Sequence, residues 1–404
     1  MSLGLLESSY LQNIANNIRA KTGLSDVYYP SEMASAISNI PSGSVDTRFA
    51  NFLMGSLSTI EDSTVTYLNS NALQGNTTFT FLSLPNCVSM DASALAGCGI
   101  FSAYLPTLAE IPQYAFQSGN INSIYAPNVS AIGASAFNSC TSLTEATFPS
   151  CTSLGSFAFS GCTQLSSATF PLLTTIQASC FDHTGLTTID MSNITSLDNH
   201  AFKTCTSLTT AYFSNCITVG QGAFSNCTNL YEVNLDSVQT IGPAAFSNCQ
   251  NLRSINLPNC TSLSAAFYSC HNLSIISIPN VDYIHGNTFY ACSALTGIDL
   301  PLVTHIHYND AFAFCINLSY ISLPVCNWIG ARAFSNCRSL MSVYLLSDSV
   351  ASLNNSTAFT NTPMVNSTYT GSFGSIFVPS NLVSAYQTAV QWSTISARIT
   401  AYVP

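Results

Sequence analysis

The stretch that decides the fold is AFSNCTNLYEVNLDSVQTIG, residues 223–242, because versions of it recur along most of the chain. It opens with an Ala-Phe pair. Further on, the apolar residues Val233 and Leu235 alternate with the polar residues Glu232 and Asn234, which predicts a strand with one buried face. Its aromatic position is filled in successive copies by Leu73, Leu95, Phe116, Phe137, Phe159, Phe181, Phe202, Phe224, Phe246, Phe267, Phe289, Phe312, Phe334 and Phe359. The copies follow one another at intervals of 21 to 25 residues, a regularity typical of repeat proteins.

The rest of each copy completes one turn of a solenoid. An apolar pair such as Val238 and Ile241 follows the predicted strand, and Gly242 then stands where the backbone turns or packs closely. One copy cannot bury its own apolar side, whereas stacked copies share a continuous core. We therefore predict a solenoid with a single parallel β-sheet on one side and with short helical or 3-10 turns and loops on the other.

Composition restricts the classes of partner. Only 6% of the residues are charged, and the net charge is −10 with eight Lys and Arg. Nucleic acids and anionic membrane surfaces attract clusters of cations, which this chain cannot supply. No apolar run approaches the ~20 residues of a membrane-spanning helix, and residues 1–10 lack the cationic and apolar regions of a secretory signal. We expect neither nucleic-acid binding nor membrane insertion. No signal peptide is visible in this chain, so either the protein is not exported by that route or its signal has been removed.

The repeat accounts for all sixteen cysteines. Ten of them follow the aromatic position by three residues: Cys98, Cys140, Cys162, Cys205, Cys227, Cys249, Cys270, Cys292, Cys315 and Cys337. Five occupy a slot after the strand that Val fills in other copies (Cys87, Cys151, Cys216, Cys260 and Cys326), and Cys180 replaces Ala. Interchange with Val and Ala indicates small buried apolar side chains. No Cys-x-x-Cys spacing suggests zinc, and parallel side chains in neighbouring copies disfavour disulfides.

No constellation of residues indicates catalysis or a cofactor. His285 and His307 share a column, with His305 and Asp310 close by, and a pair of surface histidines is a better interpretation than a metal site. There is neither a Gly-x-Ser-x-Gly elbow nor a paired-carboxylate cluster. We therefore expect no catalytic residues, no cofactor and no metal.

The pattern Leu-x-x-Ile-x-Leu-Pro-x-Val-x-x-Ile-Gly-x-x-Ala-Phe-x-x-Cys resembles the BspA-like leucine-rich-repeat family of bacterial proteins, over the part of the chain from Thr64 to Phe359. The resemblance implies a leucine-rich-repeat solenoid whose parallel strands line a concave face. Members of that family act as adhesins and binding proteins with varied partners. The resemblance is specific for the fold and says little about the ligand.

The two ends of the chain depart from the repeat. Leu11, Ile14 and Ile18 lie on one face of a predicted helix that Gly23 can end, and a second helix is predicted after Pro30. This pair resembles an N-terminal helical module of phage and prophage tail-associated proteins. We predict three parts: residues 1–44 as a helical attachment module, residues 45–370 as a solenoid of 13 or 14 repeats, and residues 371–404 as a C-terminal cap.

The strand positions that point away from the core are the candidate ligand contacts. Tyr offers a rigid apolar ring with a polar tip, which suits contact with a protein or a glycan. The alternative is that these residues are simply good strand formers. The predicted ligand-binding residues are Tyr104, Tyr125, Asp190, Tyr212, Tyr231, Asn234, Asn256, Asp299, Tyr320 and Tyr344.

The leading hypothesis is a non-enzymatic scaffold that recognises a protein or glycan ligand on a host or other cell surface. In the phage-tail version of this hypothesis, residues 1–44 attach to a virion or baseplate component. One alternative is a bacterial cell-surface adhesin, and another is a carbohydrate-active enzyme, which the lack of an acid pair disfavours. Both leading versions place the protein outside the cell, at a cell surface or on a virion.

The aromatic column gives a first testable prediction. Replacing Phe224 with Ala should lower the free energy of unfolding by about 3–5 kcal/mol, the usual cost of removing a core Phe. Tyr231→Ala in the same copy is the control, because that side chain is expected to point outward. Chemical denaturation of both variants is the measurement. An unchanged unfolding curve for Phe224→Ala would show that the column is not buried.

Overall fold

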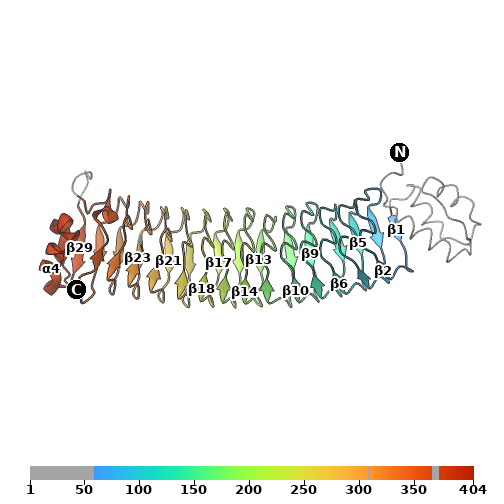
Figure 1. Ribbon diagram of the computed structural model, residues 1–404, viewed down its shortest axis with the longest axis horizontal. Helices are drawn as coiled ribbons and strands as arrows, with labels where there is room; N and C mark the ends of the chain where they lie inside the picture. Colours follow the sequence, from blue (N-terminus) through green and yellow to red (C-terminus); the bar gives the residue numbers. More distant parts are fainter. Residues whose placement is uncertain (1–58, 308, 366–372) are drawn as a thin grey trace, which may run out of the picture.

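The computed structural model describes residues 59–307, 309–365 and 373–404. Figure 1 shows a long, gently bowed rod in which the chain winds turn after turn from β1 to the helices at the C-terminal end. The predicted helical module of residues 1–44 lies outside the described residues. The repeats themselves form the predicted solenoid.

One side of the rod is a row of three-residue strands, here called the long-strand row. Consecutive members that pair do so in parallel and in register, as Asp190 does with Tyr212. The row consists of β1 (Thr59–Glu61), β3 (Phe81–Ser83), β5 (Ser102–Tyr104), β7 (Ser123–Tyr125), β9 (Glu145–Thr147), β11 (Ser167–Thr169), β13 (Thr188–Asp190), β15 (Thr210–Tyr212), β17 (Glu232–Asn234), β19 (Ser254–Asn256), β21 (Ile275–Ser277), β23 (Gly297–Asp299), β25 (Tyr320–Ser322) and β27 (Ser342–Tyr344).

A second side carries a row of two-residue strands, the short-strand row, which the prediction of a single sheet missed. Its members are β2 (Tyr67–Leu68), β4 (Ser89–Met90), β6 (Glu110–Ile111), β8 (Ala131–Ile132), β10 (Ser153–Leu154), β12 (Thr175–Ile176), β14 (Ser196–Leu197), β16 (Thr218–Val219), β18 (Thr240–Ile241), β20 (Ser262–Leu263), β22 (Tyr283–Ile284), β24 (His305–Ile306), β26 (Trp328–Ile329) and β28 (Ser352–Leu353). Each ends in an inward-facing apolar residue, the second of the apolar pair that the sequence showed. The hydrogen-bonded ladder is interrupted in both rows, for instance between β17 and β19.

The third side consists of hydrogen-bonded turns and not of the helical turns expected from the sequence. Within the described repeats the exception is the 3-10 helix η1 (Ser356–Phe359). Elsewhere at least two residues of each turn have left-handed backbone, such as Ser135 (φ 54) and Ser139 (φ 60). This alternation aims every second N–H at the next repeat, so that Phe137 N donates to Ala158 O at 2.8 Å.

Hydrogen bonds therefore join neighbouring repeats on all three sides of the rod. Parallel strands lie about 4.8 Å apart, and a turn bonded directly to the next turn is held at a similar spacing. A solenoid curves strongly when one side is spaced more widely than the other. Equal spacing keeps this rod nearly straight, so the long-strand row lines an open face along the molecule and not the hollow of a horseshoe (Figure 1).

A stack of phenylalanine rings runs through the core. Twelve rings, one from each repeat between Phe116 and Phe359, follow one another with centroids 5.0 to 5.7 Å apart and nearly parallel planes. Phe224 has none of its surface exposed. The column inferred from the sequence is thus a continuous buried layer.

The cysteines are free and buried, and most of their thiols form hydrogen bonds. Nine of them follow a Phe by three residues, and in all nine the thiol donates to the carbonyl of the Phe one repeat earlier. Cys227 Sγ lies 3.0 Å from Phe202 O, for example. That carbonyl also accepts the N–H of Cys205 within its own repeat. The thiol therefore fills a small apolar space and satisfies the second lone pair of a buried carbonyl.

Glycine after the apolar pair marks a close approach of two repeats. A Cβ on Gly155 would lie 2.3 Å from the backbone nitrogen of Ala134 in the preceding repeat. The two repeats would have to move apart locally to accept a side chain at position 155. The sequence-based interpretation of this glycine as a site of close packing is confirmed.

The C-terminal segment closes the rod at one end. The long-strand row continues through β29 (Ser375–Val378) and β30 (Ile399–Ala401), with η2 (Ser380–Leu382), α4 (Val383–Thr388) and η3 (Trp392–Arg398) between them. Trp392 is buried against Phe359, with ring centroids 6.2 Å apart, and donates to Ala351 O at 2.6 Å. The end of the phenylalanine stack is therefore covered. None of the described helices is long and apolar enough to span a membrane.

The thiols should be unreactive in the folded protein. Burial raises the pKa of both Cys162 and Cys270 to about 12, so the nucleophilic thiolate is scarce at neutral pH. Thiol titration should find few reactive groups in the native protein and nearly all sixteen after denaturation without reductant. Cys216→Val should fold and lower the denatured count by one. A low count in the denatured protein would instead reveal disulfides.

Candidate functional site

The outward side chains of the long-strand row form what we call the strand face. They are the first and third residues of each strand, since the middle residue points into the core. Near the N-terminal end of this face, the rings of Tyr104 and Tyr125 stack with centroids 5.2 Å apart and are 40% and 54% exposed. The structure thus brings together two of the residues predicted to contact ligand.

The central part of the strand face is largely occupied by its own hydrogen bonds. The Tyr212 hydroxyl donates to Glu232 Oε1 at 3.0 Å, an interaction that raises the pKa of the tyrosine. Asn234 Nδ2 donates to Asp236 at 3.0 Å, while Tyr231 beside them is 47% exposed. Asp190 pairs in register with Tyr212, but the ladder breaks before the strand of Asn256. Two of the residues predicted to bind ligand, Tyr212 and Asn234, therefore already have partners.

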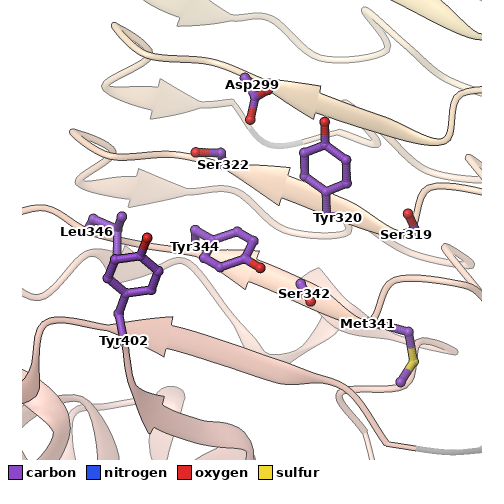
Figure 2. Close-up of a pocket in the computed structure, with 9 residues that line it drawn as sticks. All are labelled: Asp299, Ser319, Tyr320, Ser322, Met341, Ser342, Tyr344, Leu346 and Tyr402. Atoms are coloured by element: carbon purple, nitrogen blue, oxygen red, sulfur yellow. The ribbon is translucent and has the colours of Figure 1, made fainter. Parts of the chain in front are cut away.

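A hollow of about 550 Å³ opens on the strand face near the C-terminal end. We call it the tyrosine hollow, and Figure 2 shows its lining. It is lined by Asp299, Ser319, Tyr320, Ser322, Met341, Ser342, Tyr344, Leu346 and Tyr402. Three of the residues predicted from the sequence, Asp299, Tyr320 and Tyr344, thus meet in one concavity. Its size falls within the range of small-ligand sites, about 300–1,000 Å³.

The rings of the tyrosine hollow are held by packing. Tyr344 stacks on Phe377 with centroids 5.0 Å apart, and Tyr402 meets Tyr344 edge-on at 6.0 Å. Tyr320 reaches toward the strand of Asp299 (Figure 2). Partial burial and the neighbouring Asp299 carboxylate raise the pKa of the Tyr320 hydroxyl. The hollow therefore combines three tyrosine rings with one carboxylate and several serine hydroxyls.

Sequence reasoning missed Tyr402 because it lies outside the repeat. It follows β30, which joins the long-strand row only through pairing with β29. Sequence reasoning also missed Gly297, the first residue of β23, which has no side chain. The signal for Gly297 was available, since the other strands from β1 to β27 begin with residues other than glycine.

A second concavity, of about 680 Å³, is less suited to a ligand. It is lined in part by Asn215, Asn259 and Asn280. Each of these amides donates to a backbone carbonyl of the preceding repeat, at 2.9, 2.8 and 2.6 Å. The asparagines therefore fasten one repeat to the next, which leaves little of their hydrogen-bonding capacity for a ligand.

The histidine column forms an aromatic cluster on the short-strand row. The Tyr283 ring lies 4.7 Å from His285, 5.8 Å from His305 and 5.8 Å from His307, and Trp328 extends the cluster by one repeat. Partial burial and the nearby His307 lower the pKa of His285. In the described part of the chain, no three His, Cys, Asp or Glu side chains gather closely enough to hold a metal ion.

Comparison with known sequences identifies the repeat. The BspA type leucine rich repeat region (6 copies) matches residues 46–150, 130–253, 218–340 and 261–381. These overlapping segments run through most of the chain. No curated protein matches it.

Several solved structures are similar to this chain. A leucine-rich repeat protein from Bacteroides ovatus is 21% identical, with 73% of this chain and 94% of that one covered and a TM-score of 0.53. A leucine rich cell surface protein from Faecalibacterium prausnitzii is 20% identical, with coverages of 82% and 86% and a TM-score of 0.33. The T. pallidum leucine rich repeat protein is 25% identical, with coverages of 42% and 79% and a TM-score of 0.34. The first similarity shows the leucine-rich-repeat fold.

The histidine cluster gives a pH prediction. His285 should titrate below 6.5 in an NMR titration of its imidazole, and His307→Gln should raise its pKa only in part, because burial is the larger cause. A lowered pKa in the folded state means that the unfolded chain binds this proton more readily. The contribution of His285 to stability is therefore present above pH 6.5 and lost as the pH falls below it. An ordinary or raised pKa would contradict this arrangement.

Proposed function

The chain belongs to the BspA-type leucine-rich-repeat family, and on that premise we propose that it is a non-enzymatic recognition scaffold. It binds a protein or glycan of a host or other cell surface through the strand face, and the tyrosine hollow is the centre of the contact. Its place of action is outside the cell, at a cell surface or on a virion. The solenoid serves to hold a long row of side chains at fixed spacing.

The observation that carries this proposal is the chemistry of the tyrosine hollow. Rigid aromatic rings contribute apolar contact area at low entropic cost, and surrounding hydroxyls contribute hydrogen bonds, which is the composition of many recognition surfaces. Tyr320 and Tyr402 are 38% and 37% exposed and lie in one concavity. The central patch around Tyr212 is the second choice, since its polar groups are paired within the protein.

Residues 1–44 are the proposed attachment module. The support is their sequence pattern, two short amphipathic segments unlike the repeat, and its resemblance to phage and prophage tail-associated proteins. In that setting the module holds a virion or baseplate component while the strand face meets the ligand. A bacterial cell-surface adhesin is the alternative, in which the same module faces a component of the bacterium's own surface.

The proposal is tested by the binding of the protein to host-type cells. Replacing Tyr320 and Tyr402 together with Ala should weaken binding at least about tenfold, since exposed aromatic residues in a concavity are the usual hot spots of an interface. The matched control replaces Tyr268 and Tyr290 with Ala, because these rings stack at 4.8 Å on the turn side and away from the strand face. The low charge of the hollow predicts that added salt changes the affinity little.

Further arms of this assay separate the parts of the proposal. Tyr212→Ala with Tyr231→Ala should have the smaller effect, and a larger effect than that of the hollow would move the site to the central patch. Deleting residues 1–44 should leave cell binding intact. Unaltered binding by both strand-face double variants would refute recognition through this face.

A further inference from the structure

The first position of β23 is a glycine, Gly297, and the ring of Tyr320 from the next strand fills the space that a side chain would occupy there. Gly297 and Tyr320 are paired neighbours at the start of β23 and β25. A Cβ on Gly297 would lie 2.0 Å from Tyr320 Cε1 and 2.5 Å from Cδ1. The Tyr320 ring therefore packs flat against Gly297, and any larger residue at position 297 would displace the ring.

The ring that rests on Gly297 is aimed at a carboxylate. Figure 2 shows the Tyr320 hydroxyl pointing toward the strand that carries Asp299. Asp299 pairs in register with Ser322, which pairs in turn with Tyr344. The result is a row of carboxylate, hydroxyl and phenol across three neighbouring strands, beside an aromatic ring that lies along the sheet.

Apolar groups surround this row on both sides. Ile275, 67% exposed, lines an adjoining depression of about 430 Å³ that shares Asp299 and Tyr320 with the tyrosine hollow. Tyr402 stands on the other side, edge-on to the Tyr344 ring. An occupant therefore meets ring faces and an aliphatic side chain on its apolar parts, and oxygen atoms on its polar parts.

We propose that the tyrosine hollow is a binding subsite for a neutral saccharide, with the Tyr320 ring on Gly297 as the platform on which a sugar ring stacks. The inference rests on the proposed function and names the ligand class of the same site. A sugar ring presents C–H groups on its faces and hydroxyls around its rim. The ring faces of Tyr320 and Tyr402 contact the C–H groups of the sugar, and the Asp299 carboxylate accepts hydrogen bonds from its hydroxyls.

The charges in the hollow select the kind of saccharide. None of its nine lining residues is Lys, Arg or His, and Asp299 is the one carboxylate among them. A uronic acid, a sialic acid or a sulfated sugar would meet a negative charge without a compensating cation. A single carboxylate also lacks the partner that glycosidic cleavage requires. The site therefore binds neutral sugars and leaves them intact.

The test uses the full chain on an array of oligosaccharides. The neutral probes are hexamers of β-1,4-glucose, α-1,4-glucose, β-1,4-mannose and β-1,4-N-acetylglucosamine, and oligogalacturonate is the acidic probe. At least one neutral probe should bind, and the acidic probe should not. Titration calorimetry then measures the affinity of the bound probe for each variant.

The key variant is Gly297→Thr, which displaces the Tyr320 ring and leaves its chemistry intact. It should weaken binding at least about tenfold, as should Tyr320→Ala, because an aromatic platform is a dominant contact. Tyr320→Phe should retain most of the affinity, since it keeps the ring. Ser254→Thr introduces the same residue at the first position of β19, away from the hollow, and is the control for folding and binding.

The outcomes separate this inference from the proposed function. If no neutral probe binds, or if Gly297→Thr binds as tightly as the native chain, the saccharide subsite is wrong. Cell binding that still depends on Tyr320 and Tyr402 would in that case preserve recognition by the hollow and indicate a protein ligand. If no neutral probe binds and cell binding does not depend on Tyr320 and Tyr402, both the saccharide subsite and the role of the hollow as the centre of the contact are wrong. Binding of the acidic probe with equal affinity would overturn the selectivity that the charges imply.

Discussion

The phenylalanine stack is the interaction on which the rest of the molecule depends. Each buried ring covers the ring before it and is covered by the ring after it, so no repeat has a complete core without its neighbours. Removing one ring removes contacts from two adjoining repeats. The stack needs covers at its ends, and Trp392 is such a cover at the C-terminal end.

The spacing of that stack is set by hydrogen bonds on three sides. The left-handed backbone conformation found in the turns is unfavourable for residues other than glycine. In a left-handed helix it costs about 1–2 kcal/mol per residue. They persist because they direct alternate N–H groups to the next repeat, as Ser139 N does to Ser160 O at 2.7 Å. A buried N–H without a partner would cost a comparable amount. The turn is therefore stable within the stack and unfavourable in an isolated repeat.

Function is proposed for the part of this rod where the regular pattern is broken. The other strands of the long-strand row begin with a residue that has a side chain, and these side chains project next to one another from neighbouring strands. At Gly297 that rule fails, and a ring lies flat on the sheet. At the C-terminal end, the chain returns to add β29 and β30 to the row, which places Tyr402 against a strand of the repeat. Both departures from the repeat lie in the same hollow.

The sequence alone determined the repeat, the buried phenylalanine and cysteine columns and the inward face of each strand. These are local properties, since a period of about 22 residues and the alternation of apolar residues follow directly from the order of the amino acids. It also named Asp299, Tyr320 and Tyr344 as outward-facing residues. It could not show that a pair such as Tyr283 and Ile284 forms a second row of strands, because two residues are too few for a periodic signal. It did not show that Tyr212 is held by Glu232 while Tyr320 lies on Gly297. Only tertiary structure decides such contacts, because they depend on which side chains the stacking places opposite one another and on the space between them.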